Sequence, residues 1–249
     1  MQKYFYIEKC DLDNIMPYRR LPNTDQARIR ALKAVVNKNN TFNMGEFPVS
    51  FKTLAEARNF LEKFDTAHRY YKLCLENQVK SNKNYQSRLR MARLYISHFI
   101  QVLNLAVLRS EIKQEYKKYY GLTPDCYTVP DLTNETSICE WGDKIIKGEK
   151  ERLRKGGSPI YNPTIAKVTV HYDIFKDAYE SQKGLQSITN RSLEELSSMR
   201  SQADAIILDI WNQVEKKFEN LSAGEKMKKC QEYGIIYYYR TSEKKKLSL

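Results

Sequence analysis

Glycine and proline are scarce in this chain of 249 residues, which contains only 9 glycines and 7 prolines. Their scarcity excludes a collagen-like or low-complexity chain and argues against a β-sandwich, whose many turns need both residues. No apolar run reaches the roughly 20 residues that a membrane span requires. Because hydrophobic residues still make up 41% of the sequence, we expect a folded protein with a sizeable core and no membrane partner.

Cysteine and histidine are too few and too widely spaced to form a recognisable site. The five cysteines are odd in number and include no C-x-x-C pair, which excludes a zinc ribbon and a disulfide framework. None of the three histidines lies in an H-x-x-x-H pair, and only His68 has an acid, Asp65, three residues before it, whereas a di-iron bundle needs two such pairs. We predict no metal and no cofactor. The N-terminal residues lack the apolar segment of a signal peptide, so a reducing cytoplasm is the expected compartment.

Catalytic motifs are also missing. There is no phosphate-binding glycine loop, no nucleophile elbow and no local signature of a cysteine nucleophile. The glycines at positions 142, 148, 156 and 157 are interpreted as helix-packing and turn residues. The sequence therefore favours a protein without enzymatic activity. An enzyme whose site is assembled from distant residues, for example around His98, stays open as an alternative.

Apolar side chains recur every three or four residues in several long blocks. The pattern predicts long amphipathic helices over residues 53–79, 84–120 and 191–221, and a further helix over 163–184. Shorter helices are predicted over 25–38, 137–156 and 222–233. Capping boxes begin at Thr53, Ser137 and Ser222, each with a glutamate three residues later.

Four long helices predict the fold class. We expect an all-α protein, an elongated antiparallel bundle of about four long helices with short extra helices. The expected elongation follows from helix 84–120, which alone would span about 55 Å. The aromatic segments 3–7 and 235–239 are predicted as strands that pair in a small two-stranded β element from the two termini. A single domain would cover residues 1–240, followed by a basic disordered tail over 241–249.

Acidic residues are absent between Asn77 and Ser110, a segment that contains six basic residues. Five of these bases lie at or just before the start of the predicted helix 84–120, and the net charge of the chain is +12. Such a cluster binds phosphates well, and Tyr85 or Tyr95 lies close enough in sequence for base stacking. The candidate residues for binding nucleic acid or another anion are Lys83, Arg88, Arg90 and Arg93.

Two other interpretations of this basic segment remain open. The final long helix carries six acidic residues and would neutralise the segment internally if it packed alongside it. Alternatively, an acidic protein partner would bind there.

Tyrosine is abundant, with 18 residues that include the runs 70–71, 119–120 and 237–239. Tyrosine combines apolar area with a polar hydroxyl, which suits half-buried boundary positions and also subunit interfaces. Together with the long helical seams, this composition predicts a self-associating scaffold or protein-interaction protein that forms a homo-oligomer or binds a protein partner. The alternative function is polyanion binding through the four basic residues.

Three passages look like fixed motifs: residues 97–121, residues 139–168 with the run Trp141-Gly142-Asp143-Lys144, and residues 233–240. In these passages, about a third of the chain, the sequence resembles bacterial helical-bundle proteins that have no assigned activity. The resemblance implies a helical bundle, and it assigns no role to any residue.

Overall fold

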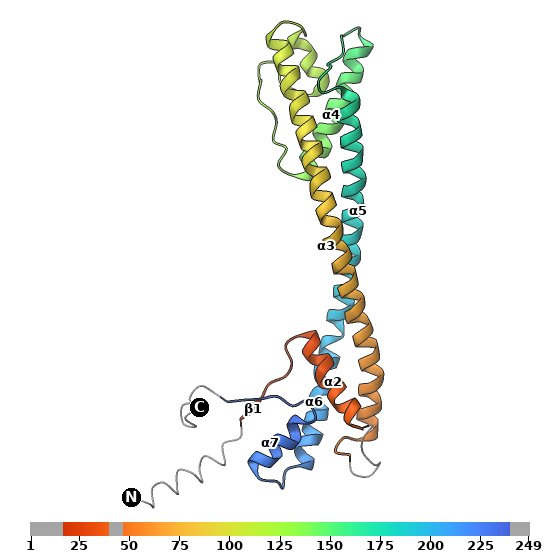
Figure 1. The fold of residues 1–249 in the computed structure, drawn as a ribbon, viewed down its shortest axis with the longest axis vertical. Coiled ribbons are helices and arrows are strands. Elements are labelled where there is room, and N and C mark those ends of the chain that lie inside the picture. Colours follow the sequence, from red (N-terminus) through yellow and green to blue (C-terminus); the bar gives the residue numbers. More distant parts are fainter. Residues whose placement is uncertain (1–16, 40–46, 240–249) are drawn as a thin grey trace, which may run out of the picture. The chain divides into compact units, whose positions relative to one another are not determined.

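The computed structural model describes residues 17–39 and 47–239, and it confirms the all-α prediction (Figure 1). The described α-helices are α2 (Asp25–Asn39), α3 (Phe51–Leu108), α4 (Glu135–Arg154), α5 (Ile165–Ser198), α6 (Arg200–Lys217) and α7 (Ala223–Gln231). A 3-10 helix, η1 (Gln114–Tyr120), and two strands, β1 (Tyr18–Arg19) and β2 (Tyr237–Tyr238), complete the described elements.

The chain divides into two compact units, each with a hydrophobic core of its own. Unit 1 consists of Met1–Leu73 and Arg191–Leu249, and unit 2 consists of Cys74–Asn190. Helices α3 and α5 each contribute residues to both units. The single domain expected over residues 1–240 stays a prediction.

Unit 1 packs α2, α6, α7 and parts of α3 and α5 around a core in which Trp211 and Phe64 are fully enclosed. Ion pairs join α2 to α6. The guanidinium of Arg28 donates to both carboxylate oxygens of Asp204, at 2.8 and 2.9 Å. Arg200 forms a second two-bond pair with Asp25, at 2.9 and 2.8 Å. Two-bond pairs of this kind fix the orientation of both partners, so they set how α2 lies on α6.

The two ends of the described chain meet in a two-stranded antiparallel sheet, as predicted. Tyr18 lies opposite Tyr238, and Arg19 lies opposite Tyr237. Glu215 of α6 anchors both strands, because it accepts hydrogen bonds from Arg19 at 3.0 Å and from the Tyr237 hydroxyl at 2.9 Å. The strand expected at residues 3–7 lies outside the described residues, as does the tail at 241–249. The described partner of β2 is β1, a segment for which no strand was predicted.

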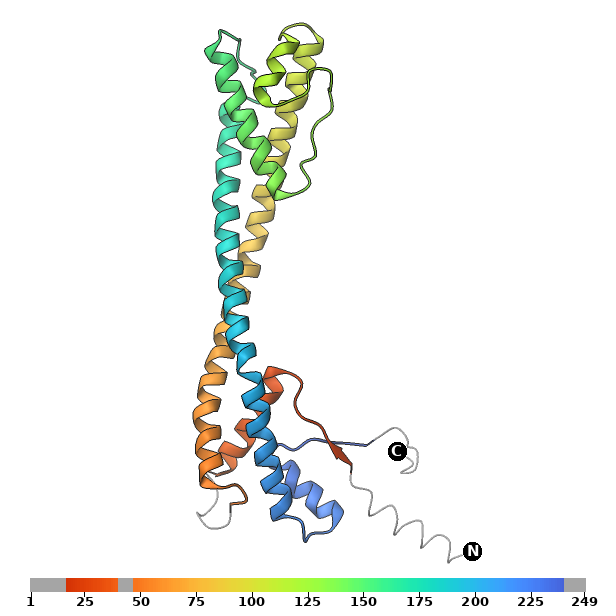
Figure 2. The ribbon, with the colours of Figure 1, turned by 180° about the vertical axis from the view of Figure 1, so that it is seen from behind.

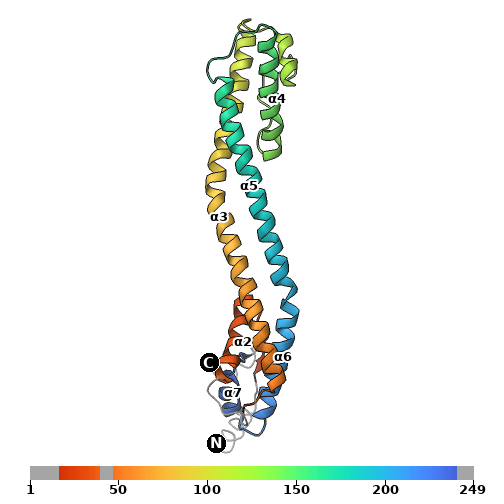
Figure 3. The same ribbon diagram turned by 90° about the vertical axis from the view of Figure 1, so that its right-hand side faces the viewer.

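Unit 2 is built on α3 and α5, which run antiparallel, with α4 packed against them (Figures 2 and 3). Aromatic rings of Tyr85, Phe175 and Tyr179 stack between α3 and α5. Tyr172 of α5 donates its hydroxyl to the backbone carbonyl of Cys139 in α4, at 2.9 Å. The packing role predicted for Gly148 is confirmed, since a Cβ at this position would lie 2.7 Å from the backbone carbonyl oxygen of Tyr119.

The structure corrects the predicted ends of α3. The expected break at residues 81–83 is wrong, because α3 continues without interruption from Phe51 to Leu108. Three polar residues without glycine or proline cost little at exposed helix positions. The helix then ends at Leu108 and not at residue 120, and the chain reverses at Ser110, whose φ is +60°. Ile112, Tyr116 and Tyr120 keep a spacing of four after the helix has ended, which explains the overlong prediction.

The expected end of the helix at Gly184 is also wrong, because α5 runs on to Ser198 and the interruption falls at Met199. A Cβ added at Gly184 would meet no neighbouring atom within 4 Å, so no close packing requires a glycine there. A glycine inside a helix lowers helix stability by only roughly 1 kcal/mol, which is too little to end α5.

Candidate functional site on the outer side of helix α3

The structure places the four predicted basic residues along α3 in unit 2, and it does not gather them into one patch. Lys83 and Arg90 are seven residues apart, so they lie on the same side of the helix, and both are exposed. Arg88 is exposed on another side, about 160° from Arg90. Arg93 is half-buried and donates a hydrogen bond to the backbone carbonyl of Thr133 at 2.8 Å, so it helps to hold the loop before α4.

Three acidic residues of the final long helix have partners elsewhere. In unit 1, Asp204 pairs with Arg28 and Glu215 pairs with Arg19. Asp209 accepts a hydrogen bond from the hydroxyl of Thr53 at 2.8 Å. Within the described residues, Lys83, Arg88, Arg90 and Arg93 form no ion pair with any carboxylate. The exposed bases of α3 therefore retain their charge toward solvent in unit 2.

The side of α3 that carries Lys83 and Arg90 is also unusually apolar farther along. Leu94, Leu105 and Leu108 are 58%, 50% and 58% exposed, and Met91 is 37% exposed. By contrast, Ile96, Phe99 and Leu103 on the opposite side of the same helix are completely buried. An exposed row of large apolar side chains on one helix face is typical of an interaction surface. The candidate residues predicted from the sequence did not include these leucines.

The same helix has the length and composition of a possible membrane span. An 18-residue window of α3 has a mean hydropathy of 1.3, and 44% of that window is buried inside the protein. The core helix of a protein outside the membrane meets the same criteria, so this finding gives weak support to a membrane location.

The histidines lie in three different surroundings. His68 is buried in α3, His98 is exposed, and His171 of α5 stacks on Tyr95 with the ring centres 4.1 Å apart. His98, the example given for a site assembled from distant residues, faces solvent. Across residues 17–39 and 47–239, no three His, Cys, Asp or Glu side chains come close enough to hold a metal ion.

A buried lysine is an unusual titratable group that sequence reasoning missed. Lys117 of η1 is fully enclosed, and its Nζ donates to the backbone carbonyls of Pro124 and Cys126, at 3.1 and 2.6 Å. The ring of Tyr127 covers the ammonium group at 4.2 Å. Burial lowers the pKa of Lys117. Because its charge is surrounded by the loop that follows η1, Lys117 holds that loop in place and is not accessible to a substrate. No local signal marks it among the 42 basic residues.

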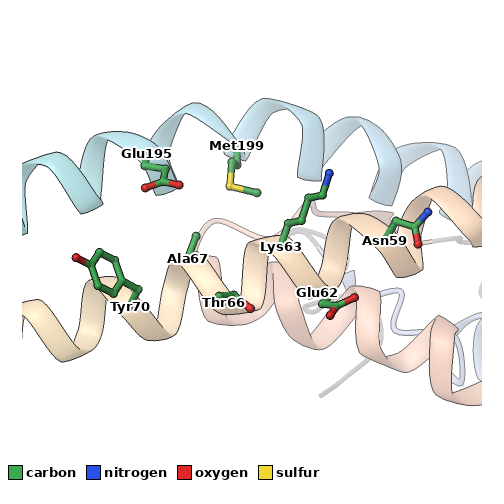
Figure 4. Close-up of a pocket in the computed structure, with 8 residues that line it drawn as sticks. All are labelled: Asn59, Glu62, Lys63, Thr66, Ala67, Tyr70, Glu195 and Met199. Atoms are coloured by element: carbon green, nitrogen blue, oxygen red, sulfur yellow. The ribbon is translucent and has the colours of Figure 1, made fainter.

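A cavity of about 760 Å³ in unit 1 is open to solvent and is lined on one side by α3 and on the other by the segment around Met199. Figure 4 shows Lys63, Ala67 and Tyr70 on one helix, with Glu195 and Met199 on the segment that faces it.

A second cavity, about 490 Å³ in unit 2, is lined by side-chain amides and by Tyr85, Glu135 and Lys183. The Tyr85 hydroxyl donates to Glu135 at 3.1 Å. Burial and this carboxylate raise the pKa of Tyr85. The phenol therefore stays protonated and serves as a donor, so the pair positions α4 on α3.

Comparisons of the chain with protein-family profiles, with curated proteins and with solved structures find no significant match. The outer side of α3 is therefore interpreted from its own geometry alone.

Proposed function

We propose that this protein is a non-enzymatic scaffold or protein-interaction protein that associates with itself. The observation that carries the proposal is the row of exposed leucines on α3, which no described part of unit 2 covers. Burying a leucine side chain is worth about 1.5–3 kcal/mol, so several of them on one face supply the free energy for a protein contact. The abundance of tyrosine is consistent with partner surfaces elsewhere on the molecule.

Self-association is tested by multi-angle light scattering coupled to size-exclusion chromatography. The chain has a mass of 29.4 kDa, and the expected result is a defined oligomer whose mass is an integer multiple of this value. The loading concentration is varied over about 1–100 µM, a range that resolves contacts of ordinary strength. A mass that stays at one chain over the whole range would contradict the proposal.

A second candidate function is polyanion binding, and the exposed, unpaired state of Lys83, Arg88 and Arg90 favours it. Contacts with phosphates release counterions, so the affinity for a nucleic acid should fall steeply as salt rises. Reversing Arg88 and Arg90 to glutamate should remove the retention of the protein on a polyanion column. The matched control reverses Lys113 and Lys118, two bases of the same unit that lie outside the acid-free segment. Equal losses in both variants would show only the effect of net charge and would contradict a specific site.

A further inference from the structure

Six exposed side chains form a regular line along the outer side of α3, which we call the α3 stripe. Their separations are 3, 4, 3, 4 and 3 residues, and the members are Met91, Leu94, His98, Gln101, Leu105 and Leu108. The fully buried residues Ile96, Phe99 and Leu103 lie on the opposite side of the helix. The stripe is thus a second face of α3, in addition to the one that builds the core of unit 2.

The spacing of the stripe identifies the kind of partner it fits. An average step of 3.5 residues keeps a line of side chains facing a second helix in a left-handed coiled coil. A helix that lies flat on a membrane has no need of this repeat and carries a wider apolar face. The stripe is only two side chains per heptad wide, so the pattern favours a single helix as its partner.

The order of apolar and polar positions along the stripe is the same in both directions. Two apolar residues stand at each end, and the polar pair His98 and Gln101 stands at the centre. When a second copy lies antiparallel across the first, Leu94 of one copy meets Leu105 of the other, and Met91 meets Leu108. The polar pair then meets its own counterpart. A polar layer at the centre of an apolar seam fixes the register of such contacts.

The charges next to the stripe are compatible with this antiparallel arrangement. Arg88 and Arg90 precede the stripe, and α3 ends where the stripe ends, at Leu108. In the antiparallel arrangement Arg90 of one copy approaches the carbonyl end of α3 in the other copy, where the helix macrodipole favours cations, whereas Arg88 lies on another side of the helix. The exposed carboxylate of Glu111, which pairs with Arg109, lies just beyond that end. In a parallel arrangement Arg90 of one copy would lie opposite Arg90 of the other.

We infer that the α3 stripe is the self-association surface, and that two copies of this chain pair through it with their α3 helices antiparallel and Leu94 against Leu105. The inference rests on the proposed self-association. It adds the surface through which two copies pair and the relative direction of their α3 helices. A two-fold symmetric pairing of this kind uses the same patch on both copies and closes as a dimer.

Sedimentation velocity on the full chain tests the inference with charge substitutions in the stripe. Leu94→Glu and Leu105→Lys each place a charge in the seam, and each should raise the dissociation constant of the dimer at least tenfold. The doubly substituted chain Leu94→Glu/Leu105→Lys should recover much of the lost affinity, because antiparallel pairing places the new acid of each copy against the new base of the other. In a parallel pair the new acids would face each other, so no recovery would occur.

The control variant is Ile188→Glu, which introduces the same charge at a 48% exposed residue of α5 in unit 2. It should dimerise like the unsubstituted chain. Circular dichroism checks that each variant keeps its helix content, which is expected because the substituted side chains are exposed.

Each other outcome has a definite meaning. If the chain associates and the stripe variants associate equally well, the stripe is not the interface, and the proposed self-association survives at another surface. If the unsubstituted chain is a monomer at all concentrations, both proposals fail. If that monomer binds vesicles of anionic lipid and Leu94→Glu abolishes this binding, the stripe is a membrane-contact face and the dimer is refuted.

Discussion

At the scale of single residues, the most constrained group in unit 2 is a buried cluster of charges. The side chains of Glu149 and Arg152 on α4 are each 1% exposed, and Arg152 donates to both carboxylate oxygens of Glu149, at 2.9 and 2.8 Å. Arg152 also donates to the carbonyl of Ser158 at 2.8 Å, and the hydroxyl of Tyr120 donates to Glu149. Burial and the carboxylate raise the pKa of Tyr120. Each buried charge in the cluster is therefore stabilised by hydrogen bonds to its neighbours in place of water.

Removing one partner of this cluster should destabilise the protein strongly. Arg152→Met leaves the Glu149 carboxylate buried without its cation, and such a loss costs about 3–5 kcal/mol of unfolding free energy. Arg154→Met is the matched control, since Arg154 pairs with Glu151 at the same i, i+3 spacing but is 76% exposed, and exposed pairs contribute about 0–1 kcal/mol. Urea denaturation followed by circular dichroism measures both variants. Similar losses of unfolding free energy in the two variants would show that burial does not increase the contribution of the Glu149–Arg152 pair to stability.

The sequence predicted little of this residue-scale detail. Glu149–Arg152 and Glu151–Arg154 have the same spacing on the same helix, and only the tertiary fold decides which pair is enclosed. Arg88, Arg90 and Arg93 were located correctly on a helix, whereas Lys83 was placed in a break and lies inside α3. The grouping of the four residues depended on their surroundings. Arg93 turned toward Thr133 because the loop before α4 passes next to it. Such contacts join residues 40 positions apart, which no local pattern records.

At the scale of elements, apolar periodicity predicted where helices exist better than where they end. The helix expected at 25–38 corresponds to α2, and the helix expected from Ser137 corresponds to α4. The cap of α4 is Asn134, whose side chain accepts from the backbone N–H of Ser137 at 2.7 Å, so the helix begins earlier than the capping box indicated. Thr53 was expected as a cap as well, but α3 begins at Phe51 and the Thr53 hydroxyl bonds to Asp209. Helix ends depend on such competing hydrogen bonds, whereas the apolar repeat does not.

At the scale of the whole molecule, the sequence predicted one domain, and the described chain has two hydrophobic cores. The row of core-facing apolar residues along α3 is continuous in the sequence. Its first part belongs to the core of unit 1 and its later part to the core of unit 2. Periodicity shows that a side chain is buried but not which distant residues bury it. Residues 191–249 return to the same unit as residues 1–73, and this long-range pairing is invisible to any local window.

Regions with separate hydrophobic cores open separately. We therefore predict that a core substitution destabilises mainly the unit that contains it. Ile96 in unit 2 and Ile207 in unit 1 are both at most 1% exposed, and replacing either with alanine should cost about 2–5 kcal/mol. Hydrogen exchange read out by mass spectrometry should then accelerate mainly in the unit that carries the substitution. Helix α3 gives the most direct comparison. Ile207→Ala should accelerate hydrogen exchange in its residues 51–73, and Ile96→Ala should accelerate exchange in its residues 74–108. If either substitution accelerates exchange equally in both parts of α3, the chain opens as one cooperative domain, as the sequence predicted, and the division into units has no energetic meaning.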